Sequence, residues 1–327
     1  MTHTKPLDMQ MLQIFVVTAQ ERNMSSAAKR LGLTQSAVSQ SIRQLEDQFG
    51  VMLFNREHRP LALTPAGLAL RNRGLVLLED MNRLKSTVVD ASHGIKPDVR
   101  VGLVDSFAAT CGTQFIKALL ARSTTLSVRT GLSPFQGEAL IARDLDIVIS
   151  SDPLSDVDGI VRRRLLFEHF LIITPQNYPG EVRTAKDLRN LSEALPIVRF
   201  NRQSHVGGQA ERFLRRMDLH IPHRLEVDTA DTLSAMVAGD IGWAVTTPMC
   251  LLQASAYARE VKLHFLTSTQ SGRSLYQLAR KDEYGQLFDE TYAIAHSIIS
   301  TSMVQKLKAI HPDLPHWVDI EAPSSEK

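Results

Sequence analysis

The sequence predicts an α/β protein with a small, mainly helical N-terminal domain, one long helix and a larger two-lobed α/β domain. Three observations support this prediction. Helical spacing of apolar residues fills residues 9–50, a helical pattern without an interior proline covers residues 64–91, and strand and helix patterns alternate from residue 99 onward. The 327 residues, 43% of them hydrophobic, suffice for two or three domains with their own cores.

Composition and charge limit the class of protein. The formal net charge is +2, but residues 22–73 hold eight basic residues against three acidic ones, a local balance of +5, and the rest of the chain is slightly acidic. A basic N-terminal segment of this kind, called the head below, is typical of a module that binds nucleic acid. The first residues lack a signal-peptide pattern, and no apolar run reaches membrane-spanning length. We therefore expect a soluble, cytoplasmic protein with no membrane partner.

The cysteines and histidines do not form a reactive pattern. Cys111 and Cys250 lie far apart, imply no disulfide framework, and are expected to be buried small side chains rather than a redox switch. His220 and His223 flank Pro222, which precludes a helical pair of metal ligands. We therefore expect no metal and no cofactor.

Three helices are expected in the N-terminal domain, residues 1–63. Apolar spacing predicts the first over residues 9–22. Ser25 and Ser26 are N-cap candidates for the second, which Gly32 ends, and Thr34 is the N-cap candidate of the third. The core-facing side of the third helix is expected to be Val38, Ile42, Leu45 and Phe49. Two helices joined by a short turn containing glycine form a helix-turn-helix pattern.

The outward face of the third helix points to nucleic acid. It consists of hydrogen-bonding groups and one arginine, and holds no acid until Glu46 and Asp47 at its far end: Gln35, Ser36, Ser39, Gln40, Arg43 and Gln44. Glutamine and serine can hydrogen-bond base edges, and arginine can pair with guanine or phosphate. The alternative is a helical hairpin with an ordinary polar surface.

Residues 50–64 predict two short strands with a basic tip. Arg56 and Arg59 stand at that tip, where they are placed for phosphates or the minor groove. A β-ribbon after the third helix makes the winged variant of the helix-turn-helix domain, and this feature favours DNA binding over the hairpin alternative.

The stretch AAKRLGLTQSAVSQSIRQLEDQFGVMLFNR, followed by LTPAG, resembles the N-terminal domain of LysR-type transcriptional regulators. The resemblance runs without a gap from about residue 12 to 70 and departs from the family at residues 23–25, which changes the entry to the second helix. It implies sequence-specific binding to double-stranded DNA. The expected DNA-binding residues are Ser25, Thr34, Gln35, Ser36, Ser39, Gln40, Arg43, Arg56 and Arg59.

A long helix is expected over residues 64–92, opened by Thr64 as N-cap and Pro65 at the first helical position. Its apolar residues alternate by four and three like a heptad seam that contains Gly74: Leu70, Leu77, Met81, Leu84 and Val88. We interpret this row as a dimerisation seam, the alternative being packing on the same chain. In the resembling family, this linker helix pairs two DNA-binding heads, which reading two half-sites requires.

An α/β domain is expected over residues 98–310, after a hinge at 93–97. Strands at 99–103, 126–130 and 145–149, with helices between them, predict a parallel sheet covered by helices. Further strands are expected at 165–174, 197–200, 225–228, 241–246 and 275–279, with helices at 206–217, 229–238 and 287–307. Residues 311–327 are expected to form a partly disordered tail.

These alternating elements resemble the periplasmic-binding-protein-like effector domain of the same regulators, less closely than the head does. The resemblance implies lobe I at about 98–165 and 270–310 and lobe II at about 166–269. Ligands of open α/β folds bind at the carboxyl ends of strands. Helix starts there suit a small anion, in this family often a carboxylate.

This rule selects an effector site of hydroxyl groups, one cation and apolar walls. The candidates are Ser106, Leu132, Ser133, Phe135, Ser150, Phe200, Arg202, Ser204, Thr229 and Thr246. Arg202 is the expected bidentate partner of a carboxylate. Each hydroxyl could serve only as a helix cap, and Phe200 could equally belong to the core.

The predicted function is transcriptional regulation by a DNA-binding protein whose C-terminal domain binds a small-molecule effector and alters promoter binding or DNA bending. The protein is expected to be bacterial and to act as a homodimer or homotetramer, with RNA polymerase as a further candidate partner. The alternative is a winged-helix protein with a catalytic α/β domain. The chain has no phosphate loop, GxGxxG, GxSxG or metal cluster that would favour an enzyme.

Overall fold

The computed structural model describes residues 7–55, 60–92, 97–267, 271–281, 283 and 285–321. The chain divides near residue 95 into two compact units, which are described separately below.

The first unit begins with three short helices, α1 (Met9–Glu21), α2 (Met24–Leu31) and α3 (Gln35–Phe49). The N-cap of α2 is Asn23, whose side chain accepts hydrogen bonds from the backbone N–H groups of Ser25 and Ser26. The prediction that one of these serines caps α2 was therefore wrong, because α2 already begins at Met24 and both serines lie in its first turn. Thr34 caps α3, and Gly32 ends α2 with a φ of 67°.

The core of this unit is built from the apolar faces of the three helices, including Leu12, Phe15 and Ile42. Phe49 was expected on the same face, but it is 46% exposed because α3 ends there. Glu46 is buried instead, and its carboxylate accepts hydrogen bonds from the backbone N–H groups of Leu53 and Phe54. This contact ties the ribbon of β1 (Phe54–Asn55) and β2 (Ala62–Leu63) to α3.

The long helix α4 (Pro65–Ser92) packs on this core through its first half. A Cβ atom on Gly74 would lie 2.8 Å from Leu12 Cδ1, so only glycine lets α4 approach α1 this closely. Leu70 also packs on the head's core, which supports same-chain packing for the start of the predicted seam. Further along α4, Leu77, Met81 and Leu84 are exposed, whereas the Val88 side chain and hinge residues 93–96 lie outside the described residues.

The second unit contains a six-stranded sheet in the order β13-β6-β12-β5-β3-β4. Strands β3 (Val99–Val104), β4 (Leu126–Gly131) and β5 (Ile147–Ser150) are parallel, as predicted, and are connected by α5 (Asp105–Thr110), α6 (Gly112–Leu120) and α7 (Ser133–Ile141). Strands β6 (Ile160–His169) and β12 (Gly272–Arg280) run antiparallel to their neighbours. The sheet is therefore mixed.

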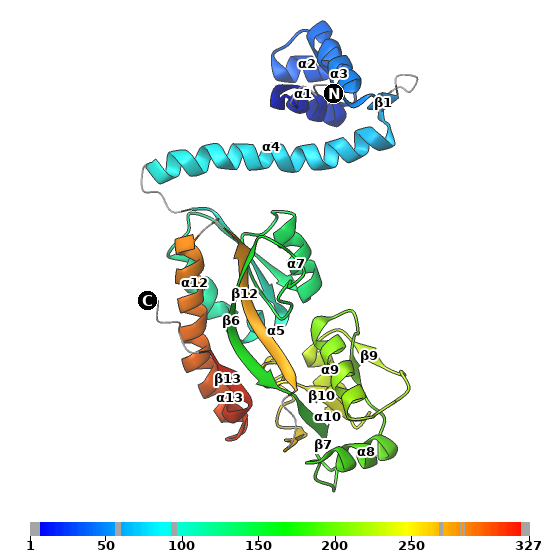
Figure 1. The fold of residues 1–327 in the computed structure, drawn as a ribbon, viewed down its shortest axis with the longest axis vertical. Coiled ribbons are helices and arrows are strands. Elements are labelled where there is room, and N and C mark those ends of the chain that lie inside the picture. Colours follow the sequence, from blue (N-terminus) through cyan, green and yellow to red (C-terminus); the bar gives the residue numbers. More distant parts are fainter. Residues whose placement is uncertain are drawn as a thin grey trace. The chain divides into compact units, whose positions relative to one another are not determined.

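A second lobe surrounds the three-stranded sheet β10-β7-β11, formed by β10 (Ala244–Thr246), β7 (Leu171–Pro175) and β11 (Val261–His264). Beside it lie the pair β8 (Arg199–Phe200) and β9 (Glu226–Val227) and the helices α8 (Ala185–Ala194), α9 (His205–Arg216), α10 (Ala230–Ala238) and α11 (Pro248–Gln253). Figure 1 shows β6 and β12 as the long adjacent strands that lead from one lobe to the other.

The C-terminal elements return to the first lobe. Helix α12 (Gly285–Ile298) passes through the π-helical turn η1 (Ile299–Met303) into α13 (Val304–Ile310). The predicted tail at residue 311 starts too early, because η2 (Leu314–Trp317) and β13 (Val318–Ile320) follow and β13 pairs with β6. Three residues make such a strand too short for a sequence pattern to show. No helix in the described part of the chain is long and apolar enough to span a membrane.

His264 on β11 predicts a pH-dependent stability. Its ring is buried, its Nδ1 accepts a hydrogen bond from the Val182 N–H, and its Nε2 lies 2.9 Å from Thr174 Oγ1. Burial lowers the pKa of His264 from 6.5 to about 4, with Glu181 opposing the shift. Between these pH values the unfolded chain binds a proton that the folded chain does not, so folding stability falls as the pH falls.

We expect the parent to lose about 3 kcal/mol from this group between pH 6.5 and pH 4. His264→Gln should unfold at lower denaturant concentration at neutral pH but show a flatter pH dependence, measured by urea unfolding across this range. His220→Gln changes a histidine that is 77% exposed and should keep the parental dependence. Parallel curves for parent and His264→Gln would contradict the assignment.

Candidate DNA-binding and effector sites

The predicted recognition face is present on α3. Gln35, Ser36, Gln40 and Arg43 are exposed and Ser39 is half-buried, while Val38, Ile42 and Leu45 on the opposite side are buried. The Arg43 guanidinium has no hydrogen bond or ion pair within the described residues, so its charge is free for a phosphate or a guanine. Glu46 does not oppose an anionic partner, because its carboxylate is turned into the fold.

Two other predicted DNA-binding residues stand at helix starts. Thr34 Oγ1 accepts a hydrogen bond from the Ala37 N–H and lies 3.0 Å from Ser36 Oγ. Ser25 is exposed in the first turn of α2. Arg56 and Arg59 lie outside the described residues, between the paired strands β1 and β2.

In the second unit, the structure joins the serines at the end of β5 to the start of α7. Ser133 Oγ lies 2.8 Å from Ser151 Oγ and accepts a hydrogen bond from the Ser151 N–H. Ser150 Oγ accepts from the Asp152 N–H. All three hydroxyl groups are buried, so they are available only to a molecule that enters between the surrounding elements.

Arg273, which the sequence analysis missed, is a cation in contact with the predicted Ser106. Its guanidinium is 2% exposed, donates to Ser106 Oγ at 2.9 Å and forms an ion pair with Glu168. The other Glu168 oxygen accepts from the Met249 N–H at 2.8 Å, in the first turn of α11. No sequence signal singled out this pair, because β6 also carries three arginines at residues 162–164 and β12 also carries Arg280.

The second lobe adds polar groups without partners. Thr246 is fully buried at the end of β10, and its Oγ1 has no hydrogen-bond partner among the described residues. The same holds for Nδ1 of His205, the first residue of α9. Burial lowers the pKa of His205, and Arg212 and Arg273 act in the same direction, against the opposite effect of Asp152. Asp152 follows β5, so His205 interacts electrostatically with a residue of the first lobe.

Several predicted effector residues serve other roles. Ser204 caps α9, and Thr229 caps α10 at the protein surface, as the alternative interpretation anticipated. Phe200 is 4% exposed and belongs to the core. Phe135 is 64% exposed, whereas its neighbour Leu132 is half-buried at the start of α7.

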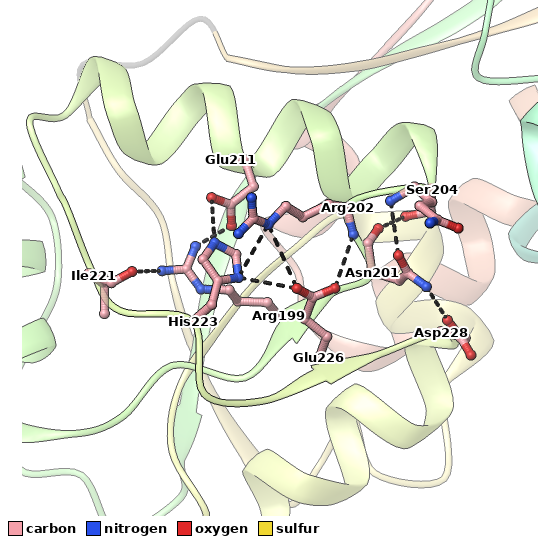
Figure 2. A network of polar contacts seen from close by, with 10 residues as sticks. Arg199, Asn201, Arg202, Ser204, Glu211, Ile221, His223, Glu226 and Asp228 are labelled. Atoms are coloured by element: carbon pink, nitrogen blue, oxygen red, sulfur yellow. Dashed lines mark hydrogen bonds and ion pairs between the residues drawn. The ribbon is translucent and has the colours of Figure 1, made fainter.

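Arg202 is not brought to the serines. Figure 2 shows its guanidinium turned away from Ser204 toward His223 and Glu226, 3.4 Å and 3.7 Å away. The same network contains the buried ion pair of Arg199 and Glu211. Arg202 therefore interacts with acidic and aromatic neighbours of its own lobe instead of an exposed anion site.

The two units each match a family model. Residues 9–68 match the bacterial regulatory helix-turn-helix protein, lysR family, and residues 92–287 match the LysR substrate binding domain. The chain belongs to the LysR family of transcriptional regulators. It is a DNA-binding transcriptional regulator with an effector-binding domain.

Relatives span most of the chain. The HTH-type transcriptional regulator GltR of Bacillus subtilis is 23% identical over 278 residues, which is 84% of this chain and 91% of GltR. The regulator YfeR of Shigella flexneri, named as uncharacterized, is 28% identical over 245 residues, covering 73% of this chain and 78% of YfeR. These relatives are regulators rather than enzymes.

Solved structures share the fold. CbnR complexed with its target DNA has a TM-score of 0.59 at 18% identity, with 89% of this chain and 99% of CbnR covered. The OxyR C206 mutant of Corynebacterium glutamicum has a TM-score of 0.58 at 18% identity, with 94% and 98% covered. The predicted order of head, long helix and two-lobed domain is confirmed.

Proposed function

We propose that this regulator binds DNA through the exposed face of α3 and is not itself an enzyme. The observation that supports this proposal is Arg43, which has no ion pair among the described residues and lies among exposed glutamines and serines on α3. Glu46 is buried, and Asp47 is the exposed acid at the far end of the helix. Arg56 and Arg59, from the predicted wing, are proposed as phosphate or minor-groove contacts. Such a protein acts in the bacterial cytoplasm, where the chromosome lies.

The exposed half of α4 supports a dimer. Leu77, Met81 and Leu84 are 48%, 40% and 64% exposed and recur at spacings of four and three along the helix. An apolar row of this spacing on one helix favours pairing with a second helix. We propose that two chains pair here, so that two heads address two half-sites. We also propose that two such dimers can form a tetramer, and that RNA polymerase is a further partner.

For the effector, we propose a small anion, such as a carboxylate, bound where the lobes meet. Ser106, Ser133 and Ser150 come from the first lobe, while the unpartnered Thr246 Oγ1 and His205 Nδ1 come from the second. Buried polar atoms without partners are costly, and a ligand that supplies hydrogen bonds to them is stabilised there. A ligand held by both lobes would favour one angle between them, which is how its binding would alter DNA binding.

The DNA interface can be tested with Arg43→Ala. We expect the affinity for operator DNA to fall by about 1–3 kcal/mol if Arg43 pairs with a base. If it contacts a phosphate, the salt dependence should become shallower by about one counterion. Titrations of the labelled operator at several salt concentrations distinguish these cases. Arg189→Ala removes the same charge from the effector domain and should bind like the parent; equal binding by Arg43→Ala would exclude Arg43 from the interface.

The dimer seam can be tested with the double variant Leu77→Asp and Leu84→Asp. Because four like charges would then face each other across the seam, we expect a monomer in sedimentation velocity. The control is Ala69→Asp with Asn72→Asp, which adds equal charge at exposed positions of α4 outside the row. If the seam variant is a monomer and the control remains a dimer, the result supports pairing through Leu77 and Leu84. A dimeric seam variant refutes it.

The effector site can be tested by thermal unfolding against small carboxylates, amino acids and aromatic acids. A ligand at about 100 times its dissociation constant should stabilise the parent by roughly 2.7 kcal/mol. Ser133→Trp should lose this shift while DNA binding persists, since the bulky ring fills the space beside Ser151. Thr246→Val, of similar shape, should weaken it. Arg202→Ala should retain the full shift, and its retention by Ser133→Trp would place the ligand elsewhere.

A further inference from the structure

A pocket lies apart from the effector site proposed above. It has a volume of about 590 Å³ and opens between the second-lobe strand β11 and the C-terminal end of α13 in the first lobe. None of the residues that line it belongs to the set around Ser133, Thr246 and Arg273. The volume lies within the range of small-molecule sites, roughly 300–1,000 Å³.

Part of the lining of this pocket is apolar. Leu263 lies in β11, and Phe265 directly follows this strand. Ile310 is the last residue of α13. The Phe265 ring is half-buried and lies 5.1 Å from Trp317 and 5.4 Å from His311, centroid to centroid. Phe265 is therefore held in place by two rings and presents a fixed apolar surface to a ligand.

The charged residues that line the pocket carry more positive than negative charge: Arg183, Arg259 and Lys262 against Glu181 and Asp313. The Glu181 carboxylate pairs with Lys262 at 2.9 Å, and Asp313 lies 3.9 Å from the His311 ring. Arg183 and Arg259 line the same pocket, are exposed, and have no hydrogen bond or ion pair to their guanidinium groups within the described residues. Glu181 also interacts electrostatically with Arg183, without a direct ion pair. Two guanidinium groups that can still donate hydrogen bonds, beside apolar side chains, match an anionic group attached to an apolar body.

We propose that this pocket is a second ligand site, for a small apolar anion such as an aromatic carboxylate or sulfonate. The apolar body would lie against Leu263, Phe265 and Ile310, and the anionic group would be bound by Arg183 and Arg259. Because the walls come from both lobes, occupancy depends on their relative position and would bias it. Binding here does not require the effector proposed for the other site.

The test uses the full-length protein and the aromatic anion anilinonaphthalene sulfonate, whose emission rises on transfer to an apolar site. Titration should give saturable binding to the folded parent. The double variant Arg183→Ser with Arg259→Ser should raise the dissociation constant by about tenfold or more, because each loses a charge-assisted hydrogen bond. Arg183→Lys with Arg259→Lys keeps both charges and should retain most of the affinity.

The matched control is Arg215→Ser with Arg224→Ser, which removes two exposed arginines of the same lobe outside the pocket. This variant should bind the probe like the parent, and unchanged thermal midpoints confirm that both serine variants fold. The proposal is overturned if the parent shows no saturable binding or if Arg183→Ser with Arg259→Ser binds unchanged. It is also overturned if the control loses as much affinity, since the effect would then be net charge alone.

Discussion

The buried ion pair of Glu168 and Arg273 is the constraint on which the two-lobed unit depends. Glu168 ends β6 and Arg273 begins β12, the two long strands that cross between lobes. Through Ser106 the pair reaches the start of α5, and through the Met249 N–H it reaches the start of α11. Removing one partner of such a pair leaves a buried charge and costs about 3–5 kcal/mol. The pair therefore holds helices from both lobes at one crossing.

The polar groups near this ion pair differ between the two lobes in how many of them have hydrogen-bond partners. The first-lobe serines are hydrogen-bonded to one another and to backbone N–H groups, whereas the second lobe contributes Thr246 Oγ1 and His205 Nδ1 without partners. A ligand gains most from the groups that lack partners and must contact the first lobe to bridge the two. If the effector binds where we propose, its contacts with both lobes would favour one angle between them.

The long helix α4 has two functions along its length. Gly74 allows its first half to join the head's core, so the direction of the helix is fixed by α1. Leu77 and Leu84 farther along are exposed, and we propose that they contact a second chain. Burial of Glu46 similarly removes one carboxylate from the surface of α3 while it anchors the ribbon, and leaves Asp47 as the exposed acid near the end of the helix. In the N-terminal unit, the contacts of Gly74 and Glu46 in the interior thus determine which side chains are exposed on α3 and α4.

The sequence by itself determined the order of elements, the helix-turn-helix, the long helix and the three parallel strands, because apolar periodicity and capping residues act locally. It also identified the exposed face of α3 and the heptad-like row. Only the tertiary structure decided that Asn23 caps α2, that Glu46 is buried, that β13 completes the sheet, and that Arg273 rather than Arg202 contacts Ser106. These depend on contacts between residues distant in sequence, such as Arg273 with Ser106, which no local periodicity encodes.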